Sequence, residues 1–154
     1  MSRHSQSTPV SARQTLMKVC AHASAEEMRS ALSGIVPHPT ITNLRVPEIG
    51  MVMLRGRVGG NGAPFNLGEA TVSRAAVRLE TGEVGYGYLL GRDLERTRLA
   101  AIIDALGQRR DERAQIEAKL VAPVTARIAR TVEINRQRTA ATRVNFFTLV
   151  RGED

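Results

Sequence analysis

The sequence is poor in aromatic residues and in cysteine, and each shortage limits what the protein can be. It has no Trp, three Phe and two Tyr among 154 residues, so its core must be built from Leu, Ile, Val, Met and Ala. Cys20 is the single cysteine, which excludes an internal disulfide and an iron–sulfur or structural zinc cluster held by this chain alone. We therefore expect no metal site and a reducing, cytoplasmic environment.

Long apolar runs are missing as well. No stretch of about 18 or more apolar residues occurs, so no membrane contact is expected. Residues 1–9 are polar with no apolar segment behind them, which argues against an export signal. We expect a disordered tail over residues 1–10 and one domain over residues 11–152, because this length suits a single hydrophobic core.

Positive charge dominates among the ionisable residues. The formal net charge is +7, and the excess comes from arginine, since only Lys18 and Lys119 are lysines. The planar guanidinium group grips phosphate or carboxylate groups with two parallel hydrogen bonds. The excess therefore suits a nucleotide, a nucleic acid or an acidic protein partner, while a solvated surface remains the plain alternative for any single arginine.

Apolar residues at helical spacing predict helices at both ends of the chain. Ser24 followed by Glu27 is a capping-box pattern that starts the second helix, which should end near Gly34. Pro123 should separate the last two helices. The expected helices are Val10–Ser24, residues 25–34, Leu94–Arg109, Asp111–Leu120 and Thr125–Thr139.

Between residues 41 and 90, short apolar runs bounded by Gly, Pro and Asn predict consecutive antiparallel strands. A C-terminal run rich in β-branched and aromatic residues should return to the same sheet. The expected fold class is α+β, with an antiparallel sheet of about four to five strands. The expected strands are Ile41–Val46, Gly50–Val58, Ala70–Leu79, Val84–Leu90 and Arg143–Arg151.

Arginines alternate with aliphatic residues in two of these strands. Because strand side chains point alternately to opposite faces, Arg55 and Arg57 share one face of their strand, and Arg74 and Arg78 share one face of theirs. If the two strands pair, the four arginines can form one basic patch across the sheet. The opposite, core face would then carry Val52, Leu54, Val77 and Leu79.

A glycine-rich loop over residues 56–69 joins the two arginine strands. Gly59, Gly60 and Gly62 could expose successive backbone N–H groups to a phosphate. The loop matches neither a P-loop nor a dinucleotide fingerprint, so alone it more often indicates a flexible hairpin connection. With the four flanking arginines and Arg92, these glycines form the candidate phosphate- or partner-binding set.

Gly85 and Gly87 alternate along the last strand before the third helix, which leaves one strand face without side chains. Such a strip lets a helix, another backbone or a ligand approach closely. Strand glycines more often serve packing, so a helix crossing is favoured over a ligand.

Familiar catalytic patterns are absent from the sequence. It contains no nucleophile elbow, HExxH helix or CxxC pair, and its three histidines are scattered. Four carboxylates could act in acid–base chemistry but are expected to balance arginines instead: Glu48, Glu69, Asp93 and Asp104. No catalytic residue is assigned, and no self-contained active site is expected.

Three stretches carry a resemblance to a known family: PEIGMVMLRGRVGGNGAPFNLGEATVSRAAVRL, GYGYLLGRDLERTRLAAIIDAL and TRVNFFTLVRG. Together they resemble the G subunit of the bacterial carbon–phosphorus lyase core complex over about residues 14–152. The family often has Trp where Leu16 stands and Asp where Asn145 stands. Neither departure touches the arginine–glycine block.

The resemblance implies a part in phosphonate catabolism, as a subunit assembled with the H, I and J subunits. It implies that the complex joins a phosphonate to ATP and displaces adenine to give α-D-ribose 1-phosphonate 5-triphosphate. The G, H and I subunits and an accessory ATP-binding-cassette-like protein are required for this step. The iron–sulfur cluster and S-adenosylmethionine of the later cleavage belong to the J subunit, so this chain alone binds no cofactor.

Two alternatives stay open beside an enzyme-complex subunit that helps bind the triphosphate or phosphonate. One is a purely structural scaffold whose arginines meet acidic faces of partner subunits. The other is a nucleic-acid-binding module, which net charge alone would favour. It is the less favoured, because the sequence has neither a recognition-helix signature nor aromatic residues interleaved with basic ones.

Overall fold

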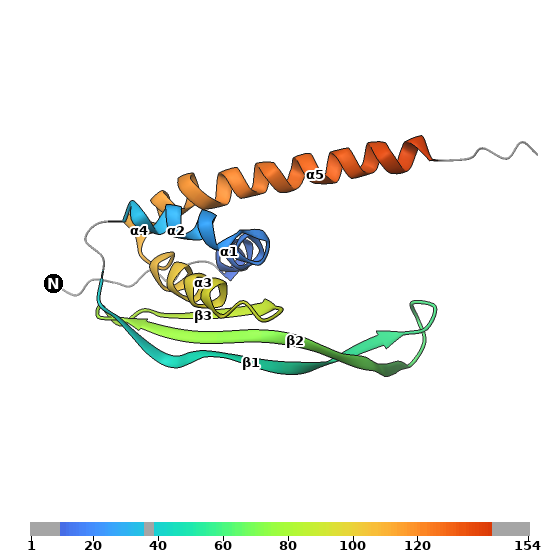
Figure 1. The fold of residues 1–154 in the computed structure, drawn as a ribbon, viewed down its shortest axis with the longest axis horizontal. Helices are drawn as coiled ribbons and strands as arrows, with labels where there is room; N and C mark the ends of the chain where they lie inside the picture. The colour runs from blue at the N-terminus through green and yellow to red at the C-terminus, as the bar shows by residue number, and fades with distance from the viewer. Residues whose placement is uncertain (1–9, 36–38, 143–154) are drawn as a thin grey trace, which may run out of the picture.

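The computed structural model describes residues 10–35 and 39–142, and it shows an α+β fold with one antiparallel sheet. The sheet has three strands in the order β1-β2-β3. Figure 1 shows helices gathered over one end of the sheet, while the β1–β2 hairpin and α5 run on beyond them. The elements are α1 (Val10–His22), α2 (Ala25–Ser33), β1 (Ile41–Arg57), β2 (Pro64–Leu79), β3 (Val84–Leu90), α3 (Leu94–Leu106), α4 (Arg110–Ile116), η1 (Glu117–Val121) and α5 (Ala122–Ala141).

The α+β class and the antiparallel sheet are confirmed, but the expected strand count is wrong within the described residues. The two strands expected before the glycine loop are one continuous strand, β1. Its register against β2 shifts between Asn43 and Arg45 and again between Arg45 and Glu48, so the chain passes Pro47 without ending the strand. Proline is tolerated there because β1 lies at the sheet edge and is bulged. The expected C-terminal strand, 143–151, and the expected tail, 1–10, fall outside the described residues apart from Val10.

The start of the second helix is confirmed in detail. The Ser24 hydroxyl accepts a hydrogen bond from the Glu27 N–H at 3.1 Å, and the Glu27 carboxylate accepts one from the Ser24 N–H at 2.7 Å. This reciprocal pair satisfies two N–H groups that a helix leaves unbonded at its start. Ser24 therefore begins α2 rather than ending α1, which stops at His22.

Pro123 does not separate two helices, contrary to the prediction. The chain passes from α4 through the π-helical turn η1 into α5 without leaving helical geometry. In this turn the Ala122 N–H bonds to the Glu117 carbonyl, five residues back. Pro123 lies in the first turn of α5, just after this π-helical turn, and the helical run continues past it.

The core lies between the sheet and the helices, and α3 is at its centre. On α3, Thr97, Ala101 and Ala105 form a ridge of small residues over the glycines of β3. A side-chain carbon on Gly85 would lie 2.0 Å from the Ala101 carbonyl oxygen, and one on Gly87 would lie 2.0 Å from that of Thr97. The expected helix crossing is confirmed, because only bare backbone leaves α3 room to pack this closely.

Candidate functional site

The four sheet arginines do not form one patch, and this prediction is wrong. Glu48 pairs with Arg74 and Met51 pairs with Thr71 across β1 and β2, and paired residues share a face. Arg55 and Arg57 alternate in step with Met51, so they lie on the Ser73 face, opposite Arg74. Parity within each strand was read correctly, but it does not say which faces of two strands coincide. That depends on the register, in which even-numbered residues of β1 from Glu48 to Leu54 pair with even-numbered residues of β2.

The prediction of which strand face packs in the core is therefore correct for β2 and wrong for β1. Val77 and Leu79 are buried under α3, with Ser73 hydrogen-bonded to Thr97 on the same side at 2.6 Å. Val52 and Leu54 lie on the opposite, uncovered face, and no residue of β1 is buried. We call this uncovered side, which carries Arg74, the open face.

On the open face, Glu48 binds two arginines. Its carboxylate accepts a hydrogen bond from Arg74 Nε at 2.8 Å and a second from Arg45. These bonds, the one from Arg45 first, hold the pKa of Glu48 below its usual value. Arg74 is thus already engaged with a carboxylate, and Tyr88 of β3 pairs beside it.

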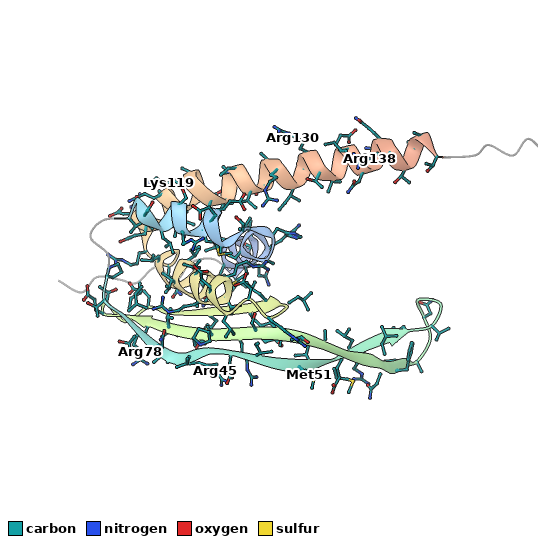
Figure 2. All side chains as sticks on the ribbon, viewed as in Figure 1. Arg45, Met51, Arg78, Lys119, Arg130 and Arg138 are labelled. Atoms are coloured by element: carbon teal, nitrogen blue, oxygen red, sulfur yellow. The ribbon has the colours of Figure 1, made fainter. Side chains whose placement is uncertain are left out.

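The other candidates lie apart from this cluster. Arg78 is exposed four residues further along β2, while Arg92 is exposed in the turn between β3 and α3. Arg55 lies seven residues beyond Glu48 on β1, or about 24 Å at ~3.4 Å per residue. In Figure 2, Arg45 and Arg78 lie at the same end of the sheet, while Arg138 lies far along α5. One phosphate group cannot touch Arg74 and Arg55 together.

The glycine loop is shorter than expected, because β1 runs to Arg57 and β2 begins at Pro64. Gly59 and Gly60 have φ of 61° and 81°, a left-handed conformation that favours glycine. The Gly62 N–H, however, bonds to the Val58 carbonyl at 3.0 Å, and Arg57 bonds to the Gly62 carbonyl at 3.1 Å. The loop thus uses one of the three candidate N–H donors to close itself.

The sequence left Asp104 as a candidate for acid–base chemistry and favoured it as a partner for arginine, but it did not show how central that pairing is. The buried Asp104 carboxylate accepts bonds from Arg13 Nε at 2.7 Å, from Arg13 Nη2 at 2.6 Å and from the Tyr86 N–H at 2.8 Å. It therefore joins α1, α3 and β3, and it contributes to packing rather than to a reaction site. An acid inside the apolar run AAIIDAL, residues 100–106, was the available signal.

A second ion pair attaches α5 to the other helices. Arg127 donates two hydrogen bonds to the Glu27 carboxylate, at 3.1 and 3.0 Å, and one to the His22 carbonyl at 2.9 Å. The pKa of Glu27 is lowered by the Ser24 backbone N–H first and by Arg127 next. The weighed carboxylate Asp93 caps α3 through the Arg96 N–H at 2.9 Å.

Cys20 is fully buried between α1 and its neighbours, and burial raises the pKa of its thiol to about 12. A thiol in that state is protonated at neutral pH and is a poor nucleophile. Within residues 10–35 and 39–142, no three His, Cys, Asp or Glu side chains gather in a way that could hold a metal ion. No helix in the same residues is both long and apolar enough to cross a membrane.

The fold and these contacts define an α+β domain whose described residues form ion pairs and caps but no complete catalytic group. The family model for the phosphonate metabolism protein PhnG matches residues 11–152, and the chain belongs to this family. It is 53% identical over 145 residues to the α-D-ribose 1-methylphosphonate 5-triphosphate synthase subunit PhnG of Rhizobium meliloti (strain 1021). That match covers 94% of this chain and 92% of the relative. The resemblance inferred from the sequence is confirmed.

Proposed function

We propose that this protein is a non-autonomous subunit of an α-D-ribose 1-methylphosphonate 5-triphosphate synthase, assembled in the cytoplasm with the H, I and J subunits. The observation that carries the proposal is the 53% identity to a subunit of that synthase over 94% of this chain. Similarity along nearly the whole length favours the same role in assembly. The lack of a complete catalytic constellation in the described residues supports a chain that is inactive alone.

In the proposed reaction, a phosphonate oxygen attacks C1′ of the ribose of ATP. The bond between C1′ and adenine breaks as the new C–O bond forms, and adenine leaves with the bonding electrons and takes up a proton. The triphosphate stays on the ribose. This chain contributes to the assembled complex in which the step occurs and binds no cofactor of its own.

Reconstitution tests the proposal. The H and I subunits and the accessory ATP-binding-cassette-like protein are mixed with ATP and methylphosphonate, with and without this chain, and free adenine is measured by chromatography. Adenine release should require this chain, and the isolated chain should release none. Equal release without this chain, or turnover by this chain alone, would contradict the proposal.

Within the complex, a structural role for Arg74 is favoured over a phosphate-binding one, because Glu48 already binds Nε of its guanidinium group. Adenine release by an assembled Arg74→Ala complex should stay within about twofold of the parental rate. A direct charge-assisted bond to the triphosphate would instead make its loss cost roughly 1.5–3 kcal/mol, or about 10- to 150-fold in ATP affinity. Such a loss, only partly recovered in Arg74→Lys, would return Arg74 to the ligand role.

A further inference from the structure

The two edges of the sheet are treated differently by the rest of the chain. At the β3 edge, Asp104 accepts the Tyr86 N–H at 2.8 Å, and Gln108 donates to the Val84 carbonyl at 2.7 Å. Side chains from α3 and its C-terminal end thus occupy backbone groups that another strand would need. A short edge blocked in this way does not accept a further strand.

The β1 edge is long and free of such blocks. β1 spans 17 residues, and in the described part of the chain no side chain bonds to its backbone. From Glu48 to Leu54 it pairs with β2 residue for residue, so this stretch is regular. In an antiparallel pair, alternate N–H and C=O groups point away from the partner strand. The stretch therefore presents a row of backbone donors and acceptors at the outer edge.

Apolar side chains accompany this row. Ile49, Met51 and Met53 lie on one face of β1 and are 49%, 68% and 52% exposed. Arg55 and Arg57 continue the same face toward the hairpin turn. An exposed apolar edge strand invites pairing with another strand, and natural proteins normally block such edges. Here the block is present on β3 and absent on β1.

We propose that the outer edge of β1 between Glu48 and Arg57 accepts an extended segment of a partner subunit as an additional strand of the sheet. The proposal rests on the proposed function, which supplies the partners. Backbone bonds give such a contact its affinity, and alternate side chains give its specificity. The segment should place apolar side chains beside Ile49, Met51 and Met53 and a carboxylate beside Arg55.

In the register centred on Met51, a second copy of this chain fits the edge poorly. Antiparallel pairing of two copies about Met51 would place Arg55 of each opposite Pro47 of the other, whose backbone has no N–H to donate. It would also bring Arg57 of each toward Arg45 of the other, and each chain carries a net charge of +7. An acidic segment from a different subunit meets the same arginines with opposite charge.

Residue-resolved hydrogen exchange tests the proposal on the isolated chain and on the complex co-expressed with the H, I and J subunits. Alternate amides between Glu48 and Arg57 should exchange in the free chain and become at least about tenfold slower in the complex, while the capped amide of Tyr86 should not change. Only strand addition gives protection with a period of two.

Matched variants complete the test. Met51→Glu should weaken co-purification of the complex at least about tenfold, and Leu90→Glu, at an equally exposed position of β3, should leave it unchanged. Arg55→Glu should weaken it most at low salt, since an acidic partner would then be repelled. Circular dichroism of each variant checks that the fold is kept, as exposed substitutions predict.

The outcomes separate the two proposals. A complex that forms without new protection in β1 overturns the added strand and leaves the proposed function standing. No complex with the wild-type chain overturns the proposed function and this inference with it. If the isolated chain alone becomes a dimer with the same alternating protection, the occupant is a second copy and not a partner subunit.

Discussion

Strands β1 and β2 are covered by helices at one end and exposed at the other. At the end beneath α3, β2 buries Ser73, Ala75 and Val77 to 3% exposure or less. At the other end, the hairpin arm formed by residues 49–68 has no buried residue, and large apolar side chains such as Met51 and Leu67 are exposed. Figure 1 shows this arm and the far part of α5 extending past the helices toward the same side of the view.

This difference indicates which part of the molecule stabilises itself. A two-stranded hairpin is at best marginally stable in water without a covered face. The distal part of α5 is in a similar position, because Val124, near the start of this helix, is its single buried residue, and Arg130 and Arg138 further along are exposed (Figure 2). The helix-covered end therefore contains the buried core, while the hairpin arm and the distal part of α5 leave apolar and basic side chains exposed.

The largest effect should come from filling the glycine strip at the covered end. Gly85→Val would push a side chain into the Ala101 carbonyl and the Ala105 N–H, both of which are helix backbone. We expect a loss of about 3 kcal/mol in the free energy of unfolding, measured by urea denaturation. Gly50→Ala on the open face is the control, because its new carbon would lie 3.8 Å from Arg74 in ordinary contact. Equal losses of unfolding free energy in the two variants would contradict the difference between the covered end and the open face.

The next largest effect should come from Asp104→Ala, which removes the carboxylate that joins α1, α3 and β3 by hydrogen bonds. It leaves the Tyr86 N–H and the partly exposed Arg13 without a carboxylate. We expect a loss of roughly 2 kcal/mol in a chemical unfolding curve, less than for a fully buried pair because Arg13 is partly solvated. Glu48→Ala, which removes an exposed carboxylate of the open face, should lower stability far less.

The smallest effect should be the loss of stability at low pH from the Arg127–Glu27 ion pair, which attaches α5 to the other helices. The folded-state pKa of Glu27 lies below its ordinary value of 4.5, so its contribution is present above that pH and is lost as pH falls through the folded pKa. The difference in Tm between the wild type and Glu27→Gln should therefore be positive at pH 6 and should shrink below about pH 4.5. A difference that grew on acidification would contradict the assigned cause.

Local features of this fold were predictable from the sequence because their causes are local. Ser24 and Glu27 cap a helix through bonds that span three residues, and Gly85 and Gly87 mark a close approach by the lack of side chains alone. Arginine alternation on β2 was likewise correct, since it needs only a period of two.

The features that could not be predicted depend on the register between two strands and on backbone hydrogen bonds that make up for a proline. The bulged passage through Pro47 makes one strand from two expected ones, and the register beyond it, in which Glu48 pairs with Arg74, places Arg55 and Arg74 on opposite faces. The π-helical turn before Pro123 satisfies the backbone where a break was expected. Neither arrangement has a pattern in neighbouring residues, because each depends on how the partner strand or the packed helix lies.

The burial of Cys20 gives the molecule a reporter of its own motions. Because this thiol is the only one in the chain and is inert while α1 is packed, it can react with a disulfide reagent only when the helix opens. The rate of Cys20 modification therefore reports how often α1 opens away from the other helices, without any engineered label. When a partner strand is bound at β1, on the far side of α3, any slowing of that rate measures how far assembly tightens the helix layer.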